Sequence, residues 1–234
     1  MALLVGLSVP VLATHTVITP NDISYDERGQ GFNGFRVYLS SPTHTNSGGR
    51  GELGWEENIN GRHWGYYAAI GNYVDGSISS SQYRSLTSRG YKVTLSQNDR
   101  NGDFIGNRNR SDNWGADVHL VTHSNAAGGN YFLAMVDDAT NTASDLTLRA
   151  ELAARVGPAV PGTEIESTGN SPFTGNLGEL RAAAPYNVYV ELFFHDTQSH
   201  VDWFGSGDDW GRSVKNDPWR YGWAIDRTLG YPRS

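Results

Sequence analysis

Residues Asn187 to Phe194 read NVYVELFF, a short run dominated by β-branched and aromatic residues. Such a run is typical of a strand that is buried in the core of a domain. Glu191 interrupts it, and a carboxylate inside an apolar run is costly to bury unless it is paired or used in function. The stretch therefore predicts a central strand and marks Glu191 as a candidate functional residue.

Segments on both sides of this strand alternate between strand and helix patterns. Further strands are predicted at residues 35–40, 91–95, 117–122 and 131–136, and helices at 81–88, 107–114, 144–156, 218–229 and from residue 56 onward. Gly157 and Pro158 end the helix at 144–156, and the Pro, Gly, Ser and Thr residues that follow predict a loop as far as Gly178. Strands that alternate with helices indicate a single α/β domain, with a mostly parallel, twisted sheet flanked by helices.

The composition limits the class of protein. With 234 residues, of which 38% are hydrophobic, the chain is long enough for one well-buried core but short for two independent domains. A formal net charge of −7 without any run of Lys or Arg argues against a nucleic-acid partner. No apolar stretch reaches the roughly 20 residues that a membrane-spanning helix needs, so no membrane span is expected. Because the chain has no cysteine, histidine and carboxylate side chains would have to bind any transition metal.

The first 34 residues are interpreted as an N-terminal arm that precedes a domain of residues 35–234. Residues Met1 to Ala13 are apolar and about as long as the hydrophobic region of a signal peptide, but Pro10 interrupts them and no basic residue precedes them. Two interpretations stay open, namely the remnant of an export signal and an arm that packs on the domain.

Four polar residues lie where a ligand site is expected in an α/β sheet. Two histidines and a glutamate fall at or just past the carboxyl end of a predicted strand, and a second glutamate opens the helix after the first strand: His44, His123, Glu191 and Glu56. Ligands of open α/β sheets bind beyond the carboxyl ends of the strands, so we expect these residues to converge at one edge. Two histidines and one glutamate form the three-ligand shell of a catalytic zinc site, which leaves a fourth position for water. A further carboxylate close to that water can act as a general base.

The sequence around these residues is similar to the motifs of a known family. The first strand leads to His44 in FRVYLSSPTHT, and Glu56 is followed four residues later by Asn60. The segment ADVHLVTHSNA contains His123, and PYNVYVELFF contains Glu191. In these segments, which follow one another in this order, the chain resembles the zinc-dependent N-acetylmuramoyl-L-alanine amidases of the amidase-3 type.

The resemblance covers roughly residues 35–231 and implies both a site and a reaction. It implies one zinc ion bound by His44, Glu56 and His123, with Glu191 as the catalytic base. The expected reaction is hydrolysis of the amide bond between N-acetylmuramic acid and L-alanine in bacterial peptidoglycan. The domain that follows the arm would then be the catalytic domain of a monomeric enzyme.

The sequence departs from the family pattern at the first ligand, where the usual Gly-His-Gly-Gly is Thr43-His44-Thr45-Asn46. The segment FFHDTQSHVDWF, at the end of the catalytic strand, is most similar to the phage and clostridial branch. Without a convincing export signal or a separate wall-binding module, the pattern favours an endolysin that acts at the bacterial cell wall, and both delivery by a phage and secretion stay open. Two alternatives stay open: a zinc peptidase that cuts within the stem peptide, and a catalytically silent wall-binding protein.

Glu57 is the neighbouring carboxylate that competes with Glu56 for the role of ligand. On a helix at about 100° per residue, apolar residues form one stripe that is expected to face the sheet: Ile59, Tyr66, Ile70 and Tyr73. Glu56 lies at the edge of that stripe, whereas Glu57 points away from it. The pattern therefore predicts that Glu56 binds the metal and that Glu57 faces solvent. Asn60, one turn beyond Glu56, is placed to orient the Glu56 side chain.

Other histidines are interpreted as structural or left open. Strand alternation places His119 on the same face as the ligand His123 but two pleats further from the edge, where a structural role is expected. Whether His195, just after the catalytic strand, lies near the substrate stays open. His63 and His200 are expected to be structural, and most Trp side chains are expected to pack in the core.

Overall fold

The computed structural model describes residues 21–27, 31–42, 57–71, 73–74, 77–78, 84–96, 104–126, 128–168, 177–206, 209–210 and 217–231. For residues 57–60, 73–74, 77–78, 166–168, 205–206 and 209–210 it describes the backbone alone. The predicted metal ligands His44 and Glu56 lie outside the described residues, as does most of the predicted arm.

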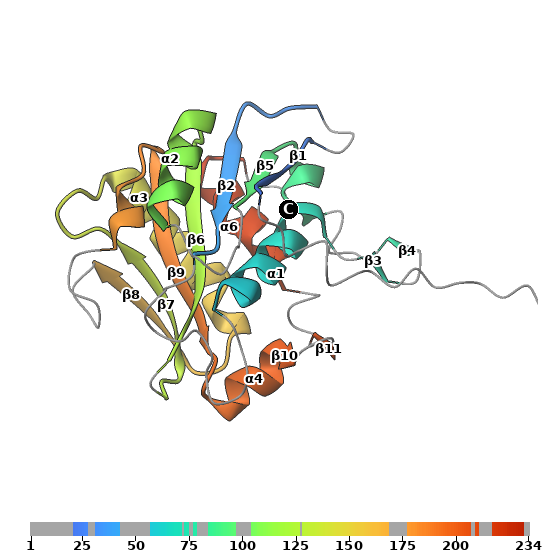
Figure 1. Cartoon of the computed structure of the whole chain (residues 1–234), viewed down its shortest axis with the longest axis vertical. Helices are drawn as coiled ribbons and strands as arrows, with labels where there is room; N and C mark the ends of the chain where they lie inside the picture. The colour runs from blue at the N-terminus through green and yellow to red at the C-terminus, as the bar shows by residue number, and fades with distance from the viewer. Residues whose placement is uncertain are drawn as a thin grey trace, which may run out of the picture.

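A seven-stranded sheet forms the centre of the domain (Figure 1). Its strands, in spatial order, are β1 (Ile23–Tyr25), β5 (Lys92–Leu95), β2 (Arg36–Ser40), β6 (Val118–Asn125), β9 (Tyr186–Phe194), β7 (Tyr131–Val136) and β8 (Thr163–Thr168). Strands β5, β2, β6 and β9 run parallel to one another, whereas β1 pairs antiparallel with β5, and β7 pairs antiparallel with β9. The prediction of a mostly parallel sheet is confirmed.

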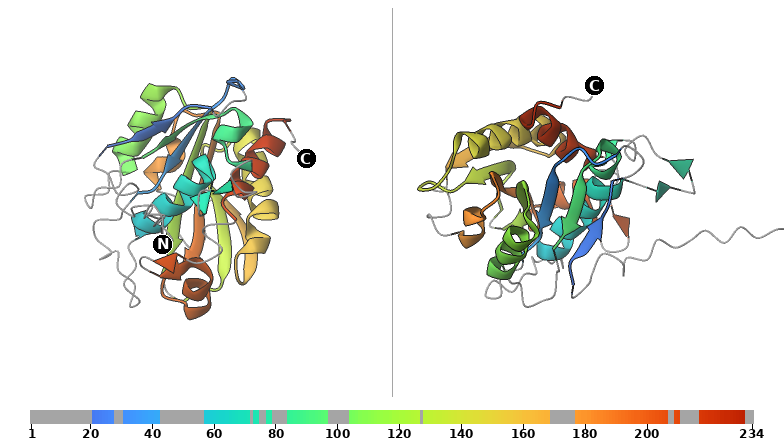
Figure 2. Two further views of the ribbon diagram at one scale, coloured as in Figure 1. Left: turned by 90° about the vertical axis from the view of Figure 1, so that its right-hand side faces the viewer. Right: turned by 90° about the horizontal axis from the view of Figure 1, so that it is seen from above.

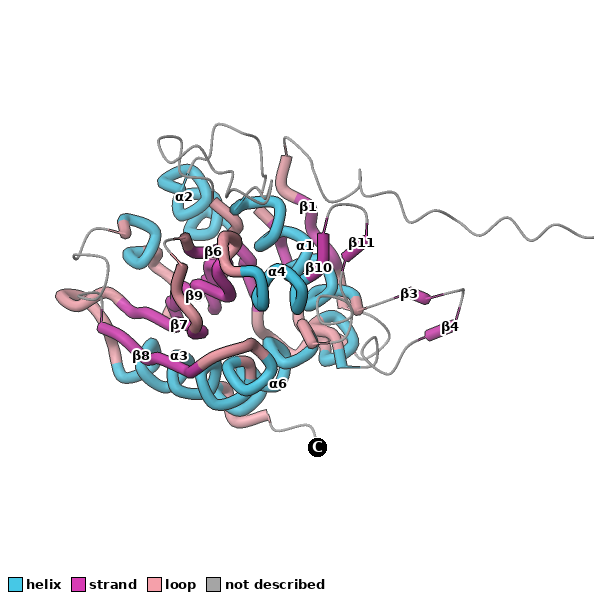
Figure 3. The backbone as a smooth tube through the Cα atoms, turned by 90° about the horizontal axis from the view of Figure 1, so that it is seen from below, coloured by secondary structure: helices cyan, strands magenta, loops and turns pink. Residues whose placement is uncertain are grey.

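Helices cover both faces of this sheet, as the α/β prediction requires. They are α1 (Glu57–Ile70), α2 (Phe104–Trp114), α3 (Ala143–Arg155), α4 (Gln198–Phe204) and α6 (Trp219–Thr228), with the 3₁₀ turns η3 (Thr87–Arg89), η4 (Gly157–Ala159) and η5 (Gly178–Arg181). Two short hairpins lie outside the sheet, namely β3 (Tyr73–Val74) with β4 (Ser77–Ile78) and β10 (Gly205–Ser206) with β11 (Asp209–Trp210). Figure 3 shows α3 and α6 on one face of the sheet and α2 on the other. Within the described ranges, every helix is too short or too polar to cross a membrane.

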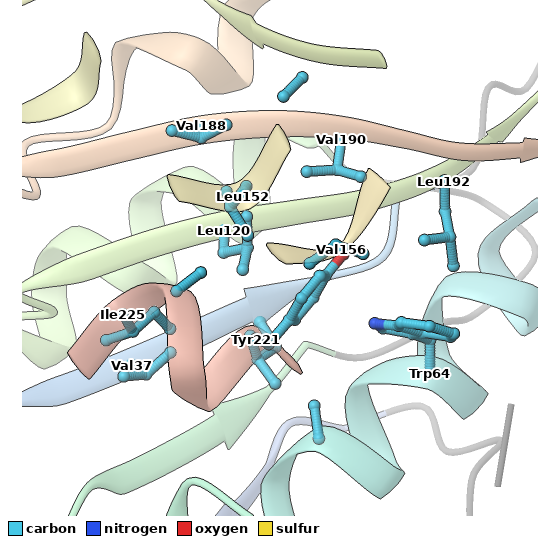
Figure 4. Close-up of a cluster of buried hydrophobic side chains, with 14 of the residues drawn as sticks. Val37, Trp64, Leu120, Leu152, Val156, Val188, Val190, Leu192, Tyr221 and Ile225 are labelled. Atoms are coloured by element: carbon cyan, nitrogen blue, oxygen red, sulfur yellow. The ribbon is translucent and has the colours of Figure 1, made fainter. Parts of the chain in front are cut away.

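The larger core lies between the sheet and the helices α1, α3 and α6. Side chains from β2, β6 and β9 meet those of the helices there, and Figure 4 labels among them Val37, Trp64, Leu120, Leu152, Val188, Val190 and Tyr221. All of these are fully buried, and each aliphatic side chain contributes about 1.5–3 kcal/mol by leaving water. A smaller core on the opposite face includes Val121, Tyr189 and, from η5, Leu180. Figure 2 shows these layers from two further directions.

Three segments differ from the predicted elements. Strand β8 forms within the segment predicted as a loop, because its backbone pairs with β7 at the edge of the sheet, a contact that its polar sequence TEIEST does not signal. Strand β1 lies in the predicted arm and pairs with β5 at the opposite edge. In its described part, the helix predicted over 81–88 is only the turn η3, since the Leu86 N–H donates to the carbonyl of Ala68 instead of to its own segment. The predicted glycine stop is present, because Gly90 ends this turn with φ at 89°.

Helix α1 faces the sheet with a different side from the predicted one. Gly61 lies so close to β6 that an added Cβ would be 2.1 Å from the carbonyl oxygen of Thr122. One turn later, Gly65 faces the side chains of Leu39 in β2 and Leu95 in β5. The glycines carry no hydrophobic signal, yet the absence of a side chain is what permits this close approach.

The prediction that this apolar stripe faces the sheet is therefore wrong, although Ile70 is buried in the larger core. Tyr66 is only partly buried, packs against that core and contacts Tyr25 of the edge strand, with ring centroids 6.4 Å apart. Tyr73 lies beyond the end of the helix. On the observed phase, Glu57 precedes Gly61 by one turn and falls on the side of the helix that faces the sheet. The helix phase no longer favours Glu56 over Glu57 as a metal ligand.

Replacement of Gly61 by alanine is expected to destabilise the domain. The added methyl group would overlap a backbone oxygen of β6, so the helix or the strand must shift, which typically costs about 1–3 kcal/mol. Over most of this range the cost outweighs the roughly 1 kcal/mol that alanine gains over glycine inside a helix. Urea unfolding measures the change, with Gly178→Ala as a control, because the nearest atom to an added Cβ there is 3.6 Å away. Equal unfolding midpoints for the two variants would contradict the close approach.

Candidate functional site

The carboxyl ends of β2, β6 and β9 meet at one edge of the sheet. The three strands are parallel neighbours, and Ser40, the last residue of β2, lies opposite Val121 of β6. Further along β6, His123 lies opposite Glu191 of β9. The two predicted site residues that the structure describes are thus brought together.

His123 and Glu191 are in direct contact at this edge. Nδ1 of His123 lies 3.2 Å from Oε2 of Glu191, and the two residues are only 5% and 3% exposed. Both lie on the face of the smaller core, because Val121 and Tyr189, two residues before each, belong to it. The apolar strand β9 can bury Glu191 because the neighbouring strand supplies a ring nitrogen as its partner.

Just past this pair the strands lose their regular register. The pairing shifts between His123 and Asn125, so that Asn125 lies opposite Phe194, and such bulges often redirect side chains next to active sites. Oδ1 of Asn125 accepts a hydrogen bond of 2.8 Å from the Ala126 N–H. Among the described residues its amide nitrogen has no acceptor, although Asn125 is only 8% exposed. A buried donor without an acceptor is suited to donate a hydrogen bond to the carbonyl oxygen of a ligand.

Tyr131 is a further residue at this edge that the sequence did not single out. It begins β7, which runs antiparallel to β9, so it lies at the same edge as the end of β9. Burial, and then the negative charge of Glu191, raise the pKa of Tyr131 above its ordinary value, so its hydroxyl stays protonated at neutral pH. Its ring packs edge-on against Phe194, with centroids 4.7 Å apart. In the sequence, Tyr131 is only an aromatic residue at the start of a predicted strand, and such residues are common in cores, so nothing marked it as part of a site.

The described residues that flank the segment with His44 and Glu56 in the chain lie at this edge. Ser41 follows β2 directly, and an added Cβ on Gly61 of α1 would be 3.2 Å from its Oγ. Helix α1 therefore begins beside the ends of β2 and β6. In the described part of the chain, no three His, Cys, Asp or Glu side chains form a group that could hold a metal ion.

The described residues fit a zinc site in their chemistry. Catalytic zinc sites use imidazole nitrogens and carboxylate oxygens as ligands, and His123 and Glu191 place one of each side by side in a buried position. The buried amide of Asn125 adds an unused donor two residues away.

The other described histidines are also buried. His119 lies on the same sheet face as His123, as predicted, and its Nε2 is 3.2 Å from Oε1 of Glu179. His200 accepts a hydrogen bond of 3.1 Å from the Phe194 N–H through Nδ1, while its Nε2 lies 2.8 Å from Oδ1 of Asn130. Burial lowers the pKa of His200, so the neutral ring links the end of β9 to the chain before β7. This contact pattern agrees with the structural role predicted for it.

His63 and His195 have different surroundings. Burial, and then the charge of Arg62, lower the pKa of His63 to about 3, so it stays neutral, in agreement with a structural role. Nδ1 of His195 lies 3.0 Å from Oγ of Ser124. The backbone N–H of His195 donates a hydrogen bond of 2.9 Å to the backbone carbonyl of Asn125. His195 therefore continues the pairing of β6 with β9 beyond the end of the strands.

Several Trp side chains have packing partners within the protein. Trp64 is fully buried in the larger core. Trp219 and Trp223 stack on each other with centroids 5.5 Å apart, and Arg84 and Arg155 cover them at 4.8 and 4.7 Å, respectively. Packing thus accounts for these three rings.

No protein-family model matches the sequence, and no curated protein matches it. The fold, in contrast, is similar to solved structures. One is the catalytic domain of CwlV, an N-acetylmuramoyl-L-alanine amidase from Bacillus (Paenibacillus) polymyxa var. colistinus, with a TM-score of 0.62 and 14% identity over 84% of this chain and 99% of that one. Another is Ami1, an N-acetylmuramyl-L-alanine amidase from Mycobacterium abscessus, with a TM-score of 0.61 and 15% identity over 84% of this chain and 99% of that one.

A third similar structure is the catalytic domain of the CD27L endolysin targeting Clostridia difficile. Its TM-score is 0.58 at 13% identity, over 86% of this chain and 99% of that one. At such low identities the similarity concerns the fold. This chain has the fold of the catalytic domains of N-acetylmuramoyl-L-alanine amidases.

Proposed function

We propose that this protein is a zinc-dependent amidase that hydrolyses the bond between N-acetylmuramic acid and L-alanine in peptidoglycan. The observation that carries the proposal is the buried contact between His123 and Glu191, in a domain with the amidase fold. The contact lies at the carboxyl edge of the parallel strands, where α/β sheets bind their ligands. A buried imidazole and carboxylate at this place offer a metal ligand and a base.

The proposed metal site consists of His44, Glu56 and His123. Two histidines and a glutamate leave the fourth position of a tetrahedral zinc site for water. The segment that contains the first two ligands follows the end of β2, which pairs with Val121 of β6, and leads into α1, where Gly61 approaches Thr122. When bound, zinc would polarise the scissile carbonyl and lower the pKa of water towards about 7.

Glu191 would act as the general base in this reaction. Its carboxylate would take a proton from the attacking water and pass it to the nitrogen of L-alanine, because an amine is too poor a leaving group as an anion. The amide of Asn125 and the hydroxyl of Tyr131 are donors at the same edge, suited to the oxygen on which negative charge develops. The products are a lactyl carboxylate on the sugar and a free amine on the stem peptide.

Product analysis tests the proposed reaction. After digestion of purified peptidoglycan, mass spectrometry should find intact stem peptides that begin with L-alanine and glycan strands that are uncut. Shortened peptides would identify a peptidase that acts within the stem. If nothing is released although the protein binds the wall, it is a wall-binding protein without this activity.

Removal of the metal is expected to abolish the activity, and added zinc should restore it. The reason is that the proposed residues alone provide a base but no group that polarises the carbonyl strongly. Zinc content is measured by elemental analysis before and after dialysis against a chelator, with circular dichroism as a control for the fold. Full activity of protein that contains no zinc would rule out the proposed mechanism.

We also propose that the enzyme is a phage endolysin. The fold similarity to the CD27L catalytic domain and the segment FFHDTQSHVDWF support this assignment. The gene should then lie among phage genes. A place among bacterial genes for wall maintenance would contradict it.

A further inference from the structure

Glu179 lies on the same face of the sheet as the candidate site and contacts three neighbouring strands. It belongs to η5 and is only 1% exposed. Its Oε1 accepts a hydrogen bond from Oγ of Ser40 in β2 and lies 3.2 Å from Nε2 of His119 in β6. Its backbone carbonyl accepts a hydrogen bond of 3.3 Å from Nδ2 of Asn187 in β9.

Ser40 is the last residue of β2, whereas His119 and Asn187 are the second residues of β6 and β9. His119 lies directly opposite Asn187, and Ser40 lies on the other side of β6, opposite Val121. Each of the three precedes a residue of the proposed site by four positions: Ser40 precedes His44, His119 precedes His123, and Asn187 precedes Glu191. One glutamate thus contacts the three strands that carry or lead to these residues of the proposed site.

The side-chain links of Glu179 depend on a single oxygen. Among the described residues, its Oε2 has no hydrogen-bond partner, so the links to β2 and β6 both end on Oε1. On the other side of Ser40, Nδ2 of Asn107 in α2 donates to its Oγ at 2.8 Å, and Arg110 in turn donates to Oδ1 of Asn107. Loss of the carboxylate would therefore remove the side-chain links to the last residue of β2 and to the start of β6 together.

We propose that Glu179 is a positioning residue that fixes β2, β6 and β9 relative to one another, and with them the residues of the proposed metal site. This inference rests on the proposed function. A metal site requires ligand distances within about 0.2 Å, so the strands that carry or lead to the ligands have to be held before the metal binds. In β6 and β9 Glu179 acts at a distance, because four residues of extended strand span about 13 Å.

A matched control is available elsewhere in the protein. Asp226 of α6 forms a buried ion pair with Arg89 and accepts a hydrogen bond of 2.8 Å from the Tyr91 hydroxyl. None of these three residues lies in β2, β6 or β9. Asp226→Ala thus removes a buried carboxylate in the same way as Glu179→Ala, but away from the strands of the site.

The test measures zinc affinity of both variants in the full chain. Competition with a chromophoric chelator gives the dissociation constant, and thermal unfolding without metal gives the stability. We expect Glu179→Ala to weaken zinc binding by about tenfold or more. Asp226→Ala should lower the unfolding midpoint and leave the zinc affinity of the folded protein close to wild type. Cobalt(II) provides a second readout, because its visible spectrum depends on ligand geometry, and it should change in Glu179→Ala alone.

The outcomes separate this inference from the proposed function. Wild-type zinc affinity and cobalt spectrum in folded Glu179→Ala would overturn the positioning role and leave the proposed function standing. If the wild-type protein binds no zinc, the proposed function fails, and the positioning role fails with it. If Glu179→Ala does not fold, Ser40→Ala is measured in the same way, since it removes only the link to β2. Unchanged zinc affinity in that variant would equally overturn the inference.

Discussion

Glu191→Gln is expected to lower turnover by about 10² or more while the zinc content stays near that of the wild type. The amide of glutamine cannot accept the proton of the attacking water, so the base is lost. The glutamine side chain has nearly the same size as that of glutamate. It can still contact Nδ1 of His123, which lies 3.2 Å from Oε2 of Glu191, so the end of β9 need not rearrange. Steady-state kinetics on peptidoglycan and elemental analysis of the purified variant measure the two effects.

Glu151→Gln is a suitable control for this variant. Glu151 forms a partly exposed pair with Arg155 on α3, and such surface pairs contribute little to stability. Its activity should remain near wild type. Loss of zinc from Glu191→Gln would make Glu191 a ligand instead of a base, and full turnover would remove it from the mechanism.

Glu56→Ala is expected to lose zinc and all measurable activity, whereas Glu57→Ala retains both. Removal of a metal ligand should weaken zinc binding beyond the roughly 10–100-fold that is typical of groups that only orient a ligand. Glu57 is the first residue of α1, where a carboxylate stabilises the helix N-terminus by about 0.3–1 kcal/mol. Its replacement should therefore appear as a small loss of stability. Zinc titration and urea unfolding of the two variants measure these effects.

This pair of variants also addresses a disagreement between the structure and the sequence pattern. Glu57 precedes Gly61 by one turn, and Gly61 faces Thr122, so the helix phase places Glu57 on the side of the sheet. Glu56 is favoured because it precedes Asn60 by four residues, as in the family that the chain resembles. Loss of zinc from Glu57→Ala, with zinc retained in Glu56→Ala, would assign the ligand to Glu57.

The register between β6 and β9 could not be predicted from the sequence. The apolar runs placed His123 and Glu191 near strand ends, because a strand pattern depends on consecutive residues. Their contact requires that the two strands align with one residue directly opposite the other, across 68 positions of the chain. That alignment is set by how the side chains of both strands pack on the two faces of the sheet.

The sequence by itself determined the α/β class and the strands β2, β5, β6, β7 and β9, because local apolar patterns and the strand period are enough to recognise them. Only the tertiary structure decided which side of α1 faces the sheet, since the close approach of Gly61 to Thr122 depends on space and not on hydrophobicity. It also decided the place of Glu179, whose partners Ser40 and His119 lie 139 and 60 positions away. The free energy of burying a carboxylate depends on such partners, and the residues beside it in the chain do not reveal them.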